Sequence, residues 1–255
     1  MNLEIIYEDN DIILCRKPAG VPTQTKRLGQ QDMESLLKNY RAKKGEQPYI
    51  GVVHRLDQPV EGLMVFAKNQ KAAASLSKQI QQRMLGKYYY AISECAPERL
   101  EGMLENYLLT DKKTNVTTVV EVYEEQLDKG MQSSKGQQDL SGAVKKAKLE
   151  YRVIASNEKG ALFDIKLHTG RQHQIRVQMA YMGCPLVGDG KYGSVENRMG
   201  TVNAKAGNRG KSLESERESL ALCSYRLEFV HPTTGKPMDF SIAPQGKAFE
   251  GFHIA

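Results

Sequence analysis

The sequence predicts an α+β fold with a largely antiparallel or mixed central β-sheet and flanking helices. Short apolar or alternating runs, which are typical of strands, outnumber the few stretches with helical periodicity. No regular alternation of strand and helix, which would build a parallel sheet, runs through the chain. With 255 residues, of which 40% are hydrophobic, the chain can form a sizeable core. We therefore expect a single domain over residues 1–255.

Turn-forming residues divide the N-terminal part of the chain into short elements. The polar cluster Glu8–Asp11 separates two apolar runs, and Pro18 and Gly20 then interrupt regular structure. A short helix is expected over Asp32–Tyr40. The strands expected in this part are Leu3–Tyr7, Ile12–Cys15, Tyr49–Val53, Gly62–Ala67 and Lys87–Ser93.

A longer helix is expected between the last two of these strands. Asn69 suits its N-cap, because a short polar side chain accepts a hydrogen bond from a free amide of the first turn. Leu76, Ile80 and Met84 recur every four residues and form one apolar face. Gly86 stands where a glycine commonly ends a helix, so we expect this helix to continue nearly to that residue.

The C-terminal part contains further strands and one more helix. The helix begins at about Gln172, carries Ile175, Met179 and Met182 on one side, and has Gly183 beyond its end. The strands expected here are Leu149–Ala155, Ala161–Leu167, Leu220–Val230 and Met238–Ile242.

Two polar segments interrupt this pattern, Gln126–Lys148 and Val195–Ser219. Neither can bury much apolar surface, so both are expected to be mobile loops. A solvated insertion is the simpler interpretation of each, and a basic arm that contacts phosphates is the alternative. The second segment contains the basic residues Arg198, Lys205, Arg209, Lys211 and Arg217.

Composition restricts the class of protein. The 36 basic and 30 acidic side chains give a net charge of +6, which suits a polyanionic partner such as nucleic acid. No stretch approaches the roughly 18 apolar residues of a membrane span, and the N-terminus lacks the pattern of a signal peptide. We therefore expect a cytoplasmic protein without a membrane partner. Neither disulfides nor a zinc site is expected from four widely spaced cysteines, Cys15, Cys95, Cys184 and Cys223.

The run His54-Arg55-Leu56-Asp57 is the first candidate for chemistry. A carboxylate follows a cation directly after the expected strand Tyr49–Val53. Strand ends can hold a reactive side chain still while it faces a cleft. A surface pair of Arg55 and Asp57 would explain the same four residues, so the run by itself does not identify a site.

Further segments accompany this run in a fixed order. They are Lys17–Pro22, Gly62–Lys68, Lys87–Ala91, Leu167–Arg176, Gly183–Asp189, Lys191–Gly193 and Leu227–Gly235. Together with Gly51–Asp57 they resemble the RluA-type RNA pseudouridine synthases, from about Ile5 to Pro244 without the two polar segments. Several unrelated motifs in the right order are far more specific than any one of them. The resemblance implies the pseudouridine synthase fold with a central catalytic cleft.

The resemblance implies an isomerase that converts uridine to pseudouridine in ribosomal or transfer RNA. The bond from C1′ to N1 breaks, the base turns, and C5 bonds to C1′, so no cofactor and no metal are expected. Asp57 matches the family's nucleophile, Tyr88 its active-site tyrosine, and Arg176 the basic residue that pairs with the nucleophile. Attack at C1′, attack at C6 and elimination through a glycal all stay open.

The same resemblance indicates which residues contact RNA. C1′ and C5 cannot be reached inside a stacked helix, so the target nucleotide is expected to flip out. Arg55 matches the residue that fills the vacated space, with His54 in a supporting role. Lys87 is expected to contact phosphate, and Arg171 is expected near the RNA or the pocket rim.

Strand alternation places Tyr88 and Tyr90 on one face and Tyr89 on the other, and one or both of Tyr89 and Tyr90 are expected to be core residues. His168 and His173 are expected to be hydrogen-bonded structural histidines.

The chain departs from the family pattern in one place. Gln58–Glu61 stands where the family usually carries a Thr-Ser pair before the glycine, which leaves substrate preference open. The stretch before Ile5 has no room for the small RNA-binding S4 domain of many relatives, so the catalytic domain and its loops, as a monomer, would select the RNA. Two alternatives stay open: an RNA-binding or RNA-chaperone protein without activity, and a phosphodiesterase that cleaves RNA with a metal.

Overall fold

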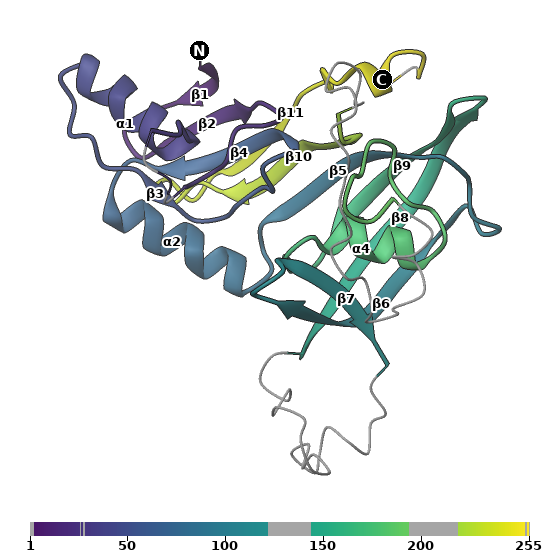
Figure 1. Ribbon diagram of the computed structural model, residues 1–255. Coiled ribbons are helices and arrows are strands. Elements are labelled where there is room, and N and C mark those ends of the chain that lie inside the picture. The colour runs from purple at the N-terminus through teal and green to yellow at the C-terminus, as the bar shows by residue number, and fades with distance from the viewer. Residues whose placement is uncertain are drawn as a thin grey trace, which may run out of the picture.

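An eleven-stranded sheet organises the protein (Figure 1). The computed structural model describes residues 3–25, 27, 29–121, 144–193, 219–252 and 254. The strands follow the order β1-β2-β4-β10-β5-β9-β8-β6-β7, with β3 also paired to β4 and β11 to β10. Among these described strands, β4 and β10 pair in parallel and the other pairs are antiparallel. The predicted α+β class and largely antiparallel sheet are confirmed.

The N-terminal elements lie close to their predicted positions. The strands are β1 (Glu4–Glu8), β2 (Ile12–Lys17), β3 (Gly51–Val52), β4 (Glu61–Ala67) and β5 (Gly86–Ser93). The helices are α1 (Met33–Lys43) and α2 (Gln70–Gln81). As predicted, Asn69 caps α2, because its side-chain oxygen accepts a hydrogen bond from the amide of Ala72 at 2.8 Å.

The predicted C-terminal end of α2 is wrong. The helix ends at Gln81, and Arg83 adopts a left-handed backbone conformation with φ 59°. Met84, expected on the apolar face, is 54% exposed, whereas Leu85 is buried in the core. The chain must turn early because Gly86, the expected helix terminator, already pairs with Glu228 in the sheet.

Two elements in the middle of the chain were not predicted, the hairpin strands β6 (Glu101–Asp111) and β7 (Val116–Val120). The further elements are β8 (Val144–Asn157), β9 (Gly160–Leu167), α4 (Gln174–Tyr181), β10 (Leu222–Val230), β11 (Pro237–Ser241) and a 3₁₀ turn, η2 (Lys247–Phe249). Residues 144–148 belong to β8, so that end of the first predicted loop is wrong. The other loop residues, 126–143 and 195–218, lie outside the described residues, and Ser219 is exposed.

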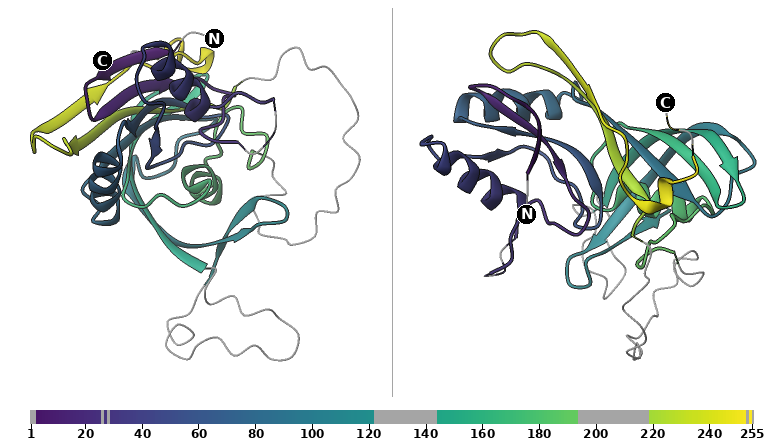
Figure 2. Two further views of the ribbon diagram at one scale, coloured as in Figure 1. Left: turned by 90° about the vertical axis from the view of Figure 1, so that its left-hand side faces the viewer. Right: turned by 90° about the horizontal axis from the view of Figure 1, so that it is seen from above.

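The helices lie on opposite faces of the sheet. Ile13 and Cys15 of β2 pack in the core that contains α1 and α4, whereas Ile12 and Leu14 pack in the core that contains α2. The sheet curves around α4, the short green helix in Figure 2. No helix in the described parts of the chain is long and apolar enough to cross a membrane.

A glycine allows the parallel contact between β4 and β10. Gly62 pairs with Ser224 and has φ 128°. A Cβ atom added to Gly62 would lie 2.4 Å from the Ser224 carbonyl oxygen, which is too close for any side chain. All seven residues of β4 are buried. This seam joins the N-terminal strands to the rest of the sheet and therefore places the segment after β3 opposite α4.

Candidate active site

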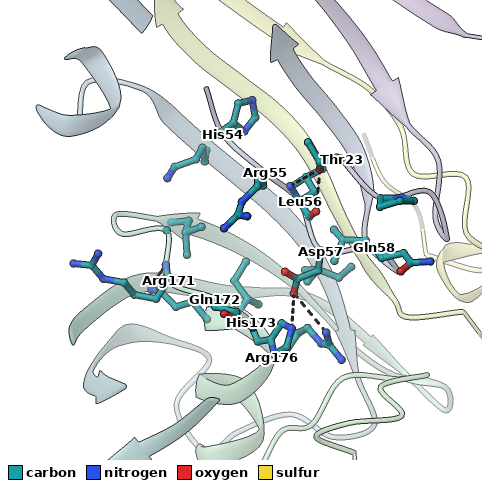
Figure 3. A pocket seen from close by; sticks show the side chains of 18 of the residues that line it. Thr23, His54, Arg55, Leu56, Asp57, Gln58, Arg171, Gln172, His173 and Arg176 are labelled. Carbon is teal, nitrogen blue, oxygen red and sulfur yellow. Dashed lines mark hydrogen bonds and ion pairs between the residues drawn. The ribbon is translucent and has the colours of Figure 1, made fainter. Parts of the chain in front are cut away.

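A cleft of about 1220 Å³ lies between the segment after β3 and the N-terminal end of α4. Segments far apart in the sequence line it, and Figure 3 shows His173 and Arg176 of one segment next to Asp57 of another. Its lining includes Thr23, the run Val52–Val60, Arg83, Lys87, Tyr89, Asn115, the run Leu167–Arg176, Lys191 and Leu222. The predicted central cleft is thus present, and it contains most of the residues expected to act in it.

Asp57 belongs to the segment after β3 and faces side chains at the N-terminal end of α4. Its Oδ2 atom is 3.4 Å from Nη1 of Arg176 and 3.9 Å from Nε2 of His173. The Asp57 side chain is 28% exposed, whereas the Arg176 side chain is only 7% exposed. The structure therefore brings together the predicted nucleophile and its predicted cation, which are 119 positions apart.

A second carboxylate holds Arg176 in place. Asp189 accepts hydrogen bonds from Nε and Nη2 of Arg176 at 2.8 and 2.7 Å, and its side chain is 1% exposed. Burial alone would lower the pKa of Arg176, but the hydrogen bonds and negative charge of Asp189 and the charge of Asp57 outweigh burial and raise it. Burial likewise disfavours the charge on Asp189, yet the bonds from Arg176 hold the pKa of that carboxyl below its usual value. The guanidinium is thus charged and fixed, with Nη1 turned to Asp57.

Asp189 has a role that was not predicted from the sequence. Its backbone neighbours also bind it, since the amides of Lys191 and Tyr192 donate to Oδ1 at 2.9 and 3.0 Å. The only available signal was its place at the end of the segment Gly183–Asp189, just before Lys191. A short acidic residue followed closely by two free amides is typical of such a turn.

The predicted tyrosine does not lie in the cleft. Tyr88 is on the opposite face of β5, where its hydroxyl donates to Oε2 of Glu228 at 2.8 Å. Burial and the Glu228 carboxylate raise the pKa of Tyr88 to about 12. Its neighbour Tyr89 is 5% exposed and lines the cleft, and burial followed by the charge of Asp57 raises the pKa of Tyr89. The placement predicted for Tyr88 is wrong by one residue.

The four predicted RNA-binding residues all line the cleft. Arg55 is exposed, and Nε of Arg171 donates to the carbonyl of Lys146 at 3.0 Å. Burial lowers the pKa of Lys87, and the positive charge of Arg171 lowers it further. Three further cations line the same cleft, Arg27, Arg83 and Lys191.

His54 supports the segment that carries Asp57. Its Nε2 atom accepts a hydrogen bond from the amide of Val65 in β4 at 3.1 Å. Burial, with a smaller effect of Lys87, lowers the pKa of His54 to about 3. The imidazole is therefore neutral at neutral pH and acts as an acceptor. His168, expected to be hydrogen-bonded, pairs with Oε1 of Glu150 at 2.9 Å.

A buried lysine fastens the chain just after Asp57. The ammonium group of Lys17 donates to the carbonyls of Pro18, Val21 and Gln58 at 2.9, 2.7 and 3.0 Å. Lys17 is fully buried, and burial lowers its pKa to about 7, although Asp57 and Glu61 oppose that shift. The sequence analysis quoted Lys17 in a motif but gave it no role.

The residues of Gln58–Glu61, where the chain departs from the family pattern, lie in two different environments. Gln58, Pro59 and Val60 line the cleft, and the amide group of Gln58 donates to the carbonyl of Gly20 at 3.0 Å. Glu61 is not part of the lining. Its Oε1 atom accepts hydrogen bonds from the amides of Gln245 and Gly246 at 3.1 and 2.9 Å, which attaches the C-terminal segment to the start of β4.

A grouping compatible with a metal ion lies away from the cleft lining. Within the described residues, Asp9, Asp11 and His231 could each offer a ligand atom. Asp9 already accepts hydrogen bonds from the amides of Asp11 and Ile12 and from the hydroxyl of Tyr7, and its Oδ2 atom is 2.7 Å from Nε2 of His231. These contacts explain the grouping as a hydrogen-bond network that closes the turn between β1 and β2.

Comparison with known proteins agrees with this geometry. A family model described as RNA pseudouridylate synthase matches residues 11–181. The chain is 30% identical over 240 residues to an uncharacterized RNA pseudouridine synthase of Mycoplasma genitalium, a match that covers 94% of this chain and 66% of that protein. It is 33% identical over 244 residues to ribosomal large subunit pseudouridine synthase D of Vibrio cholerae, with coverage of 93% and 66%. The chain therefore spans about two thirds of the length of these relatives.

The fold has a solved counterpart. The structure of human RNA Pseudouridylate Synthase Domain Containing 4 superposes with a TM-score of 0.69 at 23% identity, over 95% of this chain and 89% of that one. The fold expected from the motifs is confirmed by this likeness. Because the family model covers most of the chain, including Asp57 and Arg176, the chain belongs to the RNA pseudouridylate synthase family.

Proposed function

We propose that this protein isomerises uridine to pseudouridine in RNA, with Asp57 as the catalytic carboxylate. The observation that carries the proposal is the position of Asp57, which faces Nη1 of Arg176 inside a cleft lined by cations. Family membership supports the same reaction. The Vibrio cholerae relative, named for the ribosomal large subunit, favours ribosomal over transfer RNA as the substrate.

The arrangement suits a reaction that needs a negative charge held still. An ionised carboxylate can bond to the uridine, or it can stabilise positive charge on the sugar while the bond from C1′ to N1 breaks. Arg176 remains charged throughout the neutral pH range, and Asp189 prevents it from rotating away from Asp57. The Lys17 contacts hold the backbone after Asp57 against the neighbouring loop. Asp57 is therefore presented in one orientation.

Tyr89 takes the role first expected of Tyr88. Its ring belongs to the cleft lining, where an aromatic face can stack on a uracil that has left its helix. Arg55 is the exposed cation next to Asp57, and its planar guanidinium can fill the space of the flipped nucleotide. Lys87 and Arg171 are close enough to influence each other electrostatically and would contact the backbone phosphates.

The decisive experiment maps pseudouridines in cellular RNA after treatment with wild-type protein or with the Asp57→Asn variant, each with and without a chelator. Wild type should form pseudouridine without shortening the RNA, and Asp57→Asn should form none. RNA affinity should change less than about threefold, because the carboxylate serves the chemistry and adds no attraction to phosphate.

Each alternative has its own signature in that experiment. Binding by wild type without any pseudouridine would identify an RNA-binding protein that lacks activity. Strand cleavage that stops in the chelator would identify a phosphodiesterase. Loss of affinity in Asp57→Asn as large as its loss of rate would remove Asp57 from the chemical step.

A further inference from the structure

We propose that His173 is a positioning residue for Asp57, donating from Nε2 to its carboxylate, and that the Tyr192 hydroxyl selects the tautomer required. This inference rests on the proposed function, because it gives His173 a part in the reaction of Asp57. The sequence analysis treated His173 only as a structural histidine. Two contacts and a backbone conformation support the new role.

The first contact is geometric. Nε2 of His173 lies 3.9 Å from Oδ2 of Asp57, the same oxygen that Arg176 approaches at 3.4 Å. Figure 3 shows the imidazole and the guanidinium next to each other on one side of the carboxylate. His173 and Arg176 both approach Oδ2 of Asp57. In this proposal the other carboxylate oxygen, Oδ1, therefore faces the uridine. A modest closure on substrate binding would bring the Nε2 contact to hydrogen-bond length.

The second contact sets the position of the imidazole hydrogen. The amide of Thr117 donates to the hydroxyl oxygen of Tyr192 at 3.0 Å, so the phenol directs its own hydrogen elsewhere. Nδ1 of His173 lies 2.7 Å from that hydroxyl. Because the Thr117 amide already occupies the hydroxyl oxygen as an acceptor, we assign Nδ1 as the acceptor of the phenol hydrogen. A neutral imidazole carries one hydrogen, which must then be on Nε2, the nitrogen that faces Asp57.

The third observation concerns the backbone. His173 has φ 52°, a left-handed conformation that is uncommon outside glycine, and directly precedes α4. Its carbonyl accepts a hydrogen bond from the amide of Val177 at 3.0 Å, so the start of the helix holds this conformation. The ring has little freedom, because its side chain is 8% exposed and its edge contacts the Tyr192 ring.

Burial, more than the surrounding charges, keeps this histidine neutral. Burial lowers the pKa of His173, and the positive charges of Arg176 and Lys191 lower it further, against the opposing effects of Asp57 and Asp189. A neutral donor has an advantage here. It orients the carboxylate without placing a second full positive charge beside Arg176, which would weaken the nucleophile.

The test compares His173→Gln with His173→Leu under single-turnover conditions. Glutamine can present an N–H group near the position of Nε2, whereas leucine cannot donate. Both substitutions carry the same strain at φ 52°, so their difference isolates the donor. We expect His173→Leu to lower the rate of pseudouridine formation by roughly tenfold to a hundredfold with unchanged RNA affinity, and His173→Gln to recover most of that loss. Equal rates for the two variants would overturn the inference.

A second measurement does not depend on activity. Nitrogen NMR spectra of ¹⁵N-histidine-labelled wild type should show His173 with a hydrogen on Nε2 and none on Nδ1. The spectra of the Tyr192→Phe variant should no longer show this tautomer alone. A hydrogen on Nδ1 in wild type would reject the tautomer. If wild type forms no pseudouridine, the proposed function fails while the spectra still decide the pairing of His173 with Tyr192. If wild type is active and the His173 variants match each other, only the inference fails.

Discussion

At the scale of single residues, partners fix the direction of two buried basic side chains, Arg176 in the cleft lining and Lys17 outside it. Arg176 is clamped by Asp189, and Lys17 is enclosed by three backbone carbonyls. Each buried charge would be costly without such partners. The partners also limit how these side chains can move, so Asp57 meets a rigid environment. Rigidity of this kind is expected where a carboxylate must attack from one direction.

Tyr88→Phe and Tyr89→Phe form a matched pair of changes on the two faces of β5. Tyr89→Phe alters the cleft lining near Asp57 and should lower the rate of pseudouridine formation at least tenfold if its hydroxyl moves a proton. Tyr88→Phe removes only the hydrogen bond to Glu228 and should leave the rate within about twofold, at a stability cost of about 1 kcal/mol. Single-turnover rates and urea unfolding measure both effects. A larger rate loss for Tyr88→Phe would restore the first assignment.

His54 makes stability depend on pH. The pKa of His54 is about 3 in the folded protein and about 6.5 in the unfolded protein. Between these two pH values the imidazole is therefore protonated in the unfolded state and neutral in the folded state. Its contribution is complete above pH 6.5 and declines as the pH falls towards 3. Between pH 7.5 and 5 the loss should be about 2 kcal/mol.

The measurement is the free energy of unfolding in urea at both pH values, for wild type and for His54→Gln. Glutamine can still accept the Val65 hydrogen bond through its side-chain oxygen but does not titrate. The variant should therefore show a smaller change with pH, with the remainder due to His173 and Lys17, whose pKa values are also lowered. The same pH dependence in both proteins would mean that His54 is solvated.

At the scale of elements, the seam between β4 and β10 determines where Asp57 lies. Gly62→Ala would force a Cβ atom against the Ser224 backbone, so we expect a loss of at least about 3 kcal/mol or failure to fold. Gly235→Ala is the control, because Gly235 has φ 71° but open space around it. It should cost only about 1 kcal/mol through backbone strain. Equal losses in urea unfolding would show that strain, rather than the close contact, governs Gly62.

Elements with a clear apolar pattern could be predicted from the sequence, and elements without one could not. β4 is apolar along nearly its whole length, and Asn69 capped α2 as expected. β6 was not predicted because its residues are mostly exposed or half-buried, with half-buried residues on both faces, so its apolar pattern is weak. α2 ended early because tertiary packing of Leu85 and the sheet position of Gly86 overrode the periodicity.

At the scale of the whole molecule, the net charge of +6 has a local counterpart in the cations that line the cleft. If Arg55 and Arg171 each contact one phosphate, the double variant Arg55→Gln/Arg171→Gln should weaken RNA binding. The slope of log affinity against log salt should become shallower by about 1.5. Binding measured between low and moderate salt gives this slope.

The control removes the same charge elsewhere. Lys159→Gln/Lys236→Gln changes exposed residues that are not part of the cleft lining, and both double variants reduce the net charge from +6 by 2, to +4. The control slope should remain close to that of wild type. Equal slopes for the two double variants would mean that RNA affinity depends on the total charge of the protein and that the RNA does not bind along the cleft.

By itself the sequence determined the class of fold, most of the strands, and the choice of Asp57 and Arg176 as candidate site residues, because apolar patterns and motifs are local properties of the chain. Only the tertiary structure decided that Tyr89 rather than Tyr88 faces the cleft, that Asp189 holds Arg176, and that His173 faces Asp57. The physical reason is that alternation defines two faces of a strand but not which one is covered. That choice depends on packing between segments as distant as Asp57 and Arg176, which are 119 positions apart.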